Sequence, residues 1–96
     1  MSFTHIVAFS FNEGSDAAAR AAEALNALAP TVAEVKEFRC GPDAGVSAGN
    51  ADFGIVAVFD DEASYEVYRD HPEHQRIIKE ILVPNLTART CVQLRS

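Results

Sequence analysis

The chain has 96 residues, of which 48% are hydrophobic, and its formal net charge is −6. This length and composition predict one compact domain over residues 1–96, small enough to gain stability by associating with a second copy. The Lys and Arg side chains are scattered singly, which argues against nucleic-acid binding because that function needs clustered cations.

The first half of the chain predicts a strand, a helix and a second strand. Apolar residues alternate over residues 3–11, which is typical of a strand. Ser15 then caps an amphipathic, alanine-rich helix that stops before Pro30. Residues 31–41 favour an edge strand with a bulge, because Val35 and Phe38 cannot otherwise share one face.

The second half predicts a strand, two helices and a last strand. Residues 52–61 are apolar on both faces, so we expect a central strand that is covered on each side. Asp60 or Asp61 caps the next helix, and Pro72 begins another that ends before Pro84. The last strand, over residues 86–96, has a polar face and a face that we expect to be buried. The apolar face carries Leu86, Ala88, Val92 and Leu94.

This order of elements, βαββαβ, predicts an α+β ferredoxin-like fold with helices on one face of a four-stranded antiparallel sheet. The other sheet face still carries apolar residues. These are Ile6, Ala8, Val56 and Val58. A second subunit laid across that face would bury them, so the sequence predicts a homodimer joined through its sheets.

Membrane, metal and cofactor sites have no support in the sequence. No apolar run approaches the ~18 residues of a membrane span, and the N-terminus does not resemble a signal peptide, so we expect a cytoplasmic protein. Cys40 and Cys91 lie outside any metal-ligand spacing. His71 precedes Pro72, which favours a helix cap over a metal ligand or catalyst. We expect no metal and no cofactor.

Two histidines are candidates for a shared site between sheet and helices. His74 lies at the centre of the inward stripe of the last helix, and His5 shares the inward face of the first strand. Tyr68 either reaches the same space or projects to its rim. Because the first helix is mostly alanine, we expect unfilled volume there, and hence a pocket. Its expected lining is Val7, Phe9, Leu25, Phe53 and Ile55. A filled core, in which both histidines are hydrogen-bonded, is the alternative.

The segments "THIVAFSF", "ADFGIVAVFDDEASYEVYRDHPEHQ" and "LVPNLTARTCVQL" resemble the stress-responsive A/B barrel (Dabb) domain family along nearly the whole chain. This resemblance implies a ferredoxin-like subunit that dimerises into an α+β barrel. The family includes stress-induced plant proteins and a polyketide cyclase, olivetolic acid cyclase. Functional groups of that cyclase fall on His5, Tyr68 and His74. Its aromatic first helix is replaced here by alanines, and Phe53 stands in place of a histidine, so its substrate is not implied.

Two functions follow as expectations. The first is a small dimeric stress-responsive protein that binds a small hydrophobic molecule between sheet and helices. The alternative is a cofactor-independent, polyketide cyclase-like enzyme. In it, His74 would remove a proton α to a carbonyl while Tyr68 or His5 donates a hydrogen bond to the enolate. The same barrel also hosts cofactor-independent monooxygenases, but no redox signature in the sequence favours that reaction.

Overall fold

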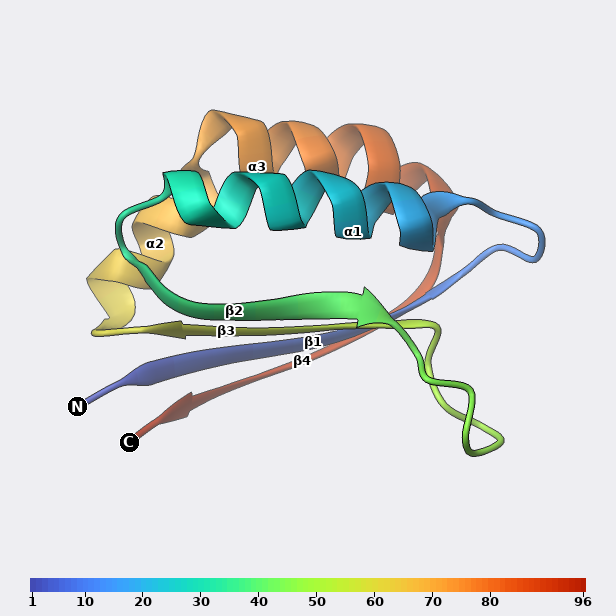
Figure 1. Ribbon diagram of the computed structural model, residues 1–96, viewed down its shortest axis with the longest axis horizontal. Coiled ribbons are helices and arrows are strands. Elements are labelled where there is room, and N and C mark those ends of the chain that lie inside the picture. Colours follow the sequence, from blue (N-terminus) through green and yellow to red (C-terminus); the bar gives the residue numbers. More distant parts are fainter.

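The computed structural model describes residues 1–96 and has the predicted ferredoxin-like architecture, with all helices on one face of the sheet (Figure 1). Its strands and helices follow in the order β1 (Phe3–Phe11), α1 (Ala17–Leu28), β2 (Val35–Pro42), β3 (Phe53–Phe59), α2 (Glu62–Asp70), α3 (Pro72–Ile77) and β4 (Leu86–Arg95). A π-helical turn over Ile78–Leu82 extends α3, and 3-10 turns cover Ala29–Thr31 and Val83–Asn85. No helix here has both the length and the apolar character needed to cross a membrane.

The sheet is antiparallel throughout, in the order β2-β3-β1-β4. The alternation read from the sequence is confirmed in both inner strands, because every second residue of β1 and of β3 is buried. The edge position of β2 and its bulge are also confirmed, since the register with β3 shifts between Val35 and Glu37.

The helix boundaries are fixed by local hydrogen bonds of the expected kind. The Asp61 carboxylate accepts a hydrogen bond from the Ser64 amide at 2.8 Å, and His71 Nδ1 accepts one from the Glu73 amide at 3.1 Å. These contacts make Asp61 and His71 the caps of α2 and α3. Ser15, which we expected to cap α1, precedes the cap position, which Asp16 occupies. The Ser15 hydroxyl still accepts a hydrogen bond from the Ala17 amide.

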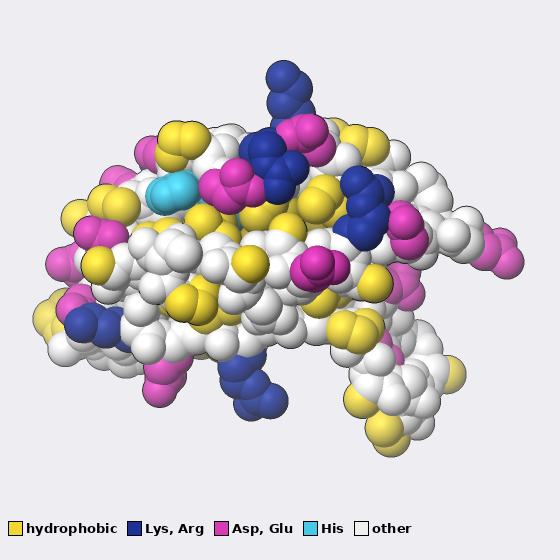
Figure 2. All heavy atoms as spheres, turned by 45° about the horizontal axis from the view of Figure 1, so that its top comes forward, with side chains coloured by type: hydrophobic (Ala, Val, Ile, Leu, Met, Phe, Trp, Pro, Cys, Tyr) yellow, Lys and Arg dark blue, Asp and Glu magenta, His cyan; other side chains and the backbone are white.

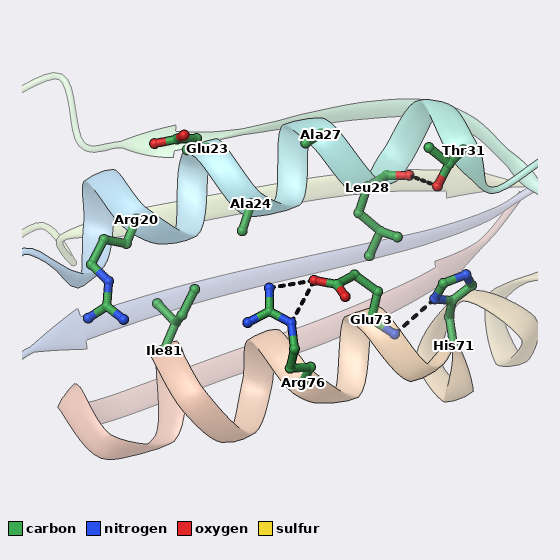
Figure 3. A pocket seen from close by; sticks show the side chains of 10 residues that line it. All are labelled: Arg20, Glu23, Ala24, Ala27, Leu28, Thr31, His71, Glu73, Arg76 and Ile81. Atoms are coloured by element: carbon green, nitrogen blue, oxygen red, sulfur yellow. Dashed lines mark hydrogen bonds and ion pairs between the residues drawn. The ribbon is translucent and has the colours of Figure 1, made fainter.

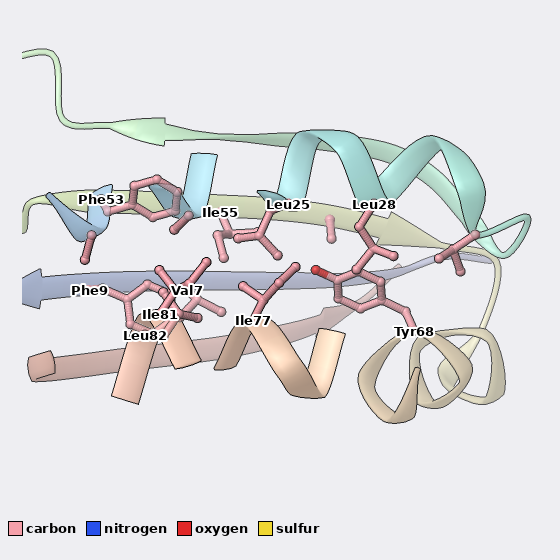
Figure 4. Packing of buried hydrophobic residues seen from close by; sticks show 14 of the residues in the cluster. Val7, Phe9, Leu25, Leu28, Phe53, Ile55, Tyr68, Ile77, Ile81 and Leu82 are labelled. Carbon is pink, nitrogen blue, oxygen red and sulfur yellow. The ribbon is translucent and has the colours of Figure 1, made fainter. Parts of the chain in front are cut away.

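The alanines of α1 pack against the sheet and do not themselves line the unfilled volume that we expected beside them. Ala17 and Ala21 are fully buried, so α1 lies directly on the inner face of the sheet. Figure 4 shows this core, in which Leu25 and Leu28 of α1 meet side chains from the strands and from the segment after α3. Short side chains here allow a close approach of helix and sheet, as dense packing requires.

The expectation of a buried apolar face on β4 is wrong for the isolated subunit. Val92 and Leu94 are about half exposed, at 50% and 49%, on the sheet face that lies away from the helices. β3 likewise lacks cover on that side, where Val56 is 42% exposed. The cause is the register of β4, which places Gln93 beside His5 and Arg89 beside Phe9. The polar face of β4 therefore lies on the helix side of the sheet.

Candidate functional site

A largely buried cavity of about 130 Å³ lies between the sheet and the helices and reaches solvent at Arg89 of β4. Its apolar lining comes from both layers of the fold. It consists of Val7, Phe9, Leu25, Ile55, Ile78, Leu82, Val83 and Leu86. Its remaining lining is His5, Tyr65, Tyr68, His74 and Arg89. The cavity thus combines an apolar interior with a small group of polar atoms, which is the usual composition of a small-molecule site.

The structure brings three of the residues singled out in the sequence to this one cavity. His5 comes from β1, Tyr68 from α2 and His74 from α3. Phe53 does not line it, although we expected it there. Its ring instead packs against Phe9 and Phe11, with centroids 6.4 Å and 6.2 Å away. Phe53 therefore belongs to the filled part of the core.

Tyr68 is the most unusual polar residue of the cavity. Its side chain is only 1% exposed, and its hydroxyl has no hydrogen-bond partner in the protein. Figure 4 shows the hydroxyl pointing from α2 into the space between the sheet and α3. Burial is the main cause that raises the pKa of Tyr68, so the phenol stays protonated and can act as a donor. Buried hydroxyls are normally hydrogen-bonded, because leaving one unpaired costs stability.

One ring nitrogen of His74 is hydrogen-bonded within the protein, and the other has no partner there. Nδ1 lies 2.9 Å from the carbonyl oxygen of Arg69. Since a carbonyl only accepts, Nδ1 carries the proton and Nε2 of the neutral ring keeps its lone pair. Burial lowers the pKa of His74, which favours this neutral form. The ring packs on Tyr68 with a centroid separation of 4.3 Å.

His5 has the opposite arrangement. The side-chain amide nitrogen of Gln93 lies 3.0 Å from Nδ1 of His5 and donates to it, so the ring proton is on Nε2. Burial first, then the charge of Arg89 and the proximity of His74, lower the pKa of His5 to about 4. At neutral pH the two imidazoles are therefore uncharged and complementary: Nε2 of His74 can accept a proton, and Nε2–H of His5 can donate a hydrogen bond.

Three polar residues around the cavity were not identified from the sequence. Tyr65 of α2 packs its ring on His5, with centroids 4.9 Å apart. Arg89 lines the cavity and Gln93 fixes the His5 tautomer, although the sequence pattern places both on the polar face of the last strand, opposite the face that we expected to be buried. The signal that places them is the pairing of β4 with β1, because it puts both residues in the inward register of His5 and Phe9.

A larger depression, of about 560 Å³, lies on the surface between α1 and α3 (Figure 3). Both of its arginines are already paired with carboxylates. Arg76 bonds to Glu73 and Glu80, while Arg20 pairs with Asp16. Figure 2 shows cationic and anionic side chains next to one another on the helical face. No unpartnered buried polar atom faces this groove, so the internal cavity is the stronger candidate for a binding site.

Comparison with known families gives one match over nearly the full length. The model of the Stress responsive A/B Barrel Domain (Dabb) family matches residues 3–95. Among curated proteins, no sequence matches this chain.

Solved structures of the same fold come from several organisms. A dimeric ferredoxin-like protein of unknown function from Thermobifida fusca YX is 35% identical, with a TM-score of 0.90 over 100% of this chain and 92% of that one. A dimeric protein of unknown function from Bacteroides fragilis is 22% identical, with a TM-score of 0.86 over 99% and 96%. A hydroxynitrile lyase from Passiflora edulis is 17% identical, with a TM-score of 0.80 over 97% and 91%.

Proposed function

Since the chain belongs to the stress responsive A/B barrel domain family, we propose that it is a homodimer that binds a small, mostly apolar molecule in the cavity between sheet and helices. The observation that carries this proposal is the buried Tyr68 hydroxyl, which has no partner in the protein and lines the cavity. A ligand oxygen or nitrogen in the cavity would satisfy that hydroxyl and remove the cost of leaving it unpaired.

The dimensions of the cavity set the size of the ligand. An apolar cavity of about 150 Å³ holds one benzene molecule in a well-studied engineered protein. The cavity here is of similar volume, about 130 Å³. The bound part of the ligand is therefore about the size of a single ring, with at least one hydrogen-bonding atom near Tyr68.

The homodimer rests on the open face of the sheet. On this face Ile6 of β1 lies between Val56 of β3 and Val92 of β4. Two residues away, Thr4 of β1 lies between Val58 and Leu94. A contiguous apolar surface of this kind is characteristic of an interface. The relatives from Thermobifida fusca and Bacteroides fragilis are described as dimeric, which supports the same assembly here.

Binding can be tested with benzamide, a neutral probe with one ring and an amide. We expect benzamide to shift the backbone amide resonances of the cavity-lining residues in the wild-type protein. Ile78→Phe, which puts a ring into the cavity, should abolish these shifts. Val67→Phe is the matched control, because Val67 is exposed on α2 and does not line the cavity. Equal shifts in wild type and Ile78→Phe would place the probe elsewhere and refute the proposal.

A second candidate function, acid–base catalysis without a cofactor, is favoured by the complementary tautomers of the two histidines. In this scheme Nε2 of His74 removes a proton α to the carbonyl of a polyketide-like or other enolisable substrate. His5 Nε2–H and the Tyr68 hydroxyl donate hydrogen bonds to the enolate oxygen that forms. The hydroxynitrile lyase from Passiflora edulis has the same fold, so the fold accommodates an enzyme.

Proton exchange on a simple ketone tests this catalytic role without the natural substrate. Acetophenone in heavy water should exchange its α-protons for deuterium faster with the protein than with buffer alone, as followed by NMR. His74→Gln should remove most of this acceleration, since a general base contributes roughly 10²–10⁴-fold. His71→Asn serves as control, because it removes an imidazole outside the cavity and keeps a capping side chain. Unchanged exchange in His74→Gln would eliminate His74 as the base.

A further inference from the structure

The charged residues of the cavity lining indicate which chemical class of small molecule the proposed binding site accepts. Arg89 is the one charged residue in the lining, and no carboxylate lines the cavity with it. Arg89 also forms no ion pair, in contrast to Arg20, Arg69, Arg76 and Arg95. The side of the cavity that reaches solvent at Arg89 is thus electropositive, although the chain as a whole carries a net charge of −6.

Arg89 lies at the solvent-exposed side of the cavity, away from its apolar interior. It lies on β4 directly opposite Phe9, whose ring is in the lining, and its side chain is exposed at the solvent side. The influence of Arg89 reaches His5 inside, because its charge contributes to the low pKa of that histidine. A guanidinium so placed offers paired N–H donors to a planar anion at the mouth of the cavity.

We propose that the ligand is a small carboxylate. In this arrangement Arg89 binds the carboxylate at the solvent side, and the apolar remainder lies among Val7, Phe9 and Ile78. This inference rests on the proposed binding function, since it names the chemical class of the molecule that occupies the cavity. A second hydrogen-bonding atom on the apolar part would in addition satisfy the Tyr68 hydroxyl, whereas the selection for a carboxylate depends on Arg89 alone.

Benzoate and benzamide make a matched pair of probes, because they share ring and shape and differ in charge. We expect the wild-type protein to bind benzoate more tightly than benzamide by about tenfold or more, since hydrogen bonds to charged groups are the stronger ones. Arg89→Gln, which keeps a polar side chain of similar reach, should abolish this preference and leave benzamide binding unchanged. Added NaCl should weaken benzoate binding and not benzamide binding.

Lys79→Gln is the matched control, because Lys79 is an exposed cation without an ion pair that lies outside the cavity lining. It removes the same unit of charge and should retain the preference for benzoate. If benzamide binds and benzoate binds no more tightly, or if Arg89→Gln keeps the preference, the carboxylate inference is wrong and the binding function stands. If neither probe binds the wild-type protein, both the inference and the proposed binding function fail.

Discussion

The hydroxyl of Tyr68 is a single group whose removal should change stability and binding in opposite directions. In the free protein it is buried without a partner, so Tyr68→Phe deletes an unsatisfied donor and keeps the ring. We expect the free energy of unfolding to rise by about 1–3 kcal/mol, while benzamide binding weakens. Urea unfolding measures the first effect. Tyr65→Phe, at a partly buried tyrosine, should change stability little. A lower stability of Tyr68→Phe would mean that its hydroxyl is already satisfied.

His5 makes the stability of the protein sensitive to acid. Its pKa is lowered from 6.5 to about 4 by burial, by Arg89 and by His74. Between these two pH values the unfolded chain binds the proton and the native protein does not, so the free energy of unfolding falls as the pH falls. Over the range from pH 6.5 to 4, His5 should account for a loss of roughly 3 kcal/mol. The lowered pKa of His74 acts in the same direction.

Urea unfolding at several pH values measures this loss, and NMR titration of the imidazole measures the pKa itself. His5→Gln should flatten the pH dependence of stability between pH 6.5 and 4. A wild-type protein that is more stable at pH 4.5 than at pH 7 would contradict the assignment of His5 as a buried neutral imidazole.

Among the elements, α1 shows how the sequence sets the distance between helix and sheet. Ala21 is fully buried against the core, whereas Ala19 on the same helix is exposed. Ala21→Leu adds three carbon atoms where no space is left, so it should destabilise the protein by about 1–3 kcal/mol. Ala19→Leu should have little effect on thermal unfolding. A more stable Ala21→Leu protein would reveal a void under α1.

The segment after α3 has a different role, because its π-helical turn supplies Ile78 and Leu82 to the cavity. We expected one regular helix from Pro72 to the residue before Pro84, and the structure changes to a wider turn at Ile78. π-helical turns are rare in proteins, and those that occur are often found at functional sites. Here the wider turn is part of the wall that lines the cavity.

For the whole molecule, the proposed homodimer depends on the open face of the sheet. We expect light scattering to give a mass twice the 10.4 kDa of one chain. Val92→Lys puts a charge on the open face and should shift the mass toward that of a monomer. Val67→Lys is the matched control, because Val67 (48%) is as exposed as Val92 (50%). Val67 lies on α2, on the other side of the sheet from the open face. A Val92→Lys protein that stays dimeric would show that the subunits meet through another surface.

The fold and the inward direction of His5 and His74 could be predicted from the sequence. Alternation over two residues set the faces of β1 and β3, and helical phase directed His74 toward the sheet, because both patterns depend only on local backbone geometry. The bulge in β2 and the helix cap at His71 could also be predicted, because they too depend on local backbone geometry.

The surroundings of these two histidines, in contrast, depend on the packing of the folded chain. The places of Arg89 and Gln93 depend on which strand β4 pairs with and in which register, including the shift between Ser10 and Phe11. The cavity, and the exclusion of Phe53 from it, depend on how side chains from β1, α1, β3, α2, α3 and β4 fill the same space. A cavity is the volume that remains after this packing, so no single segment of the sequence encodes it.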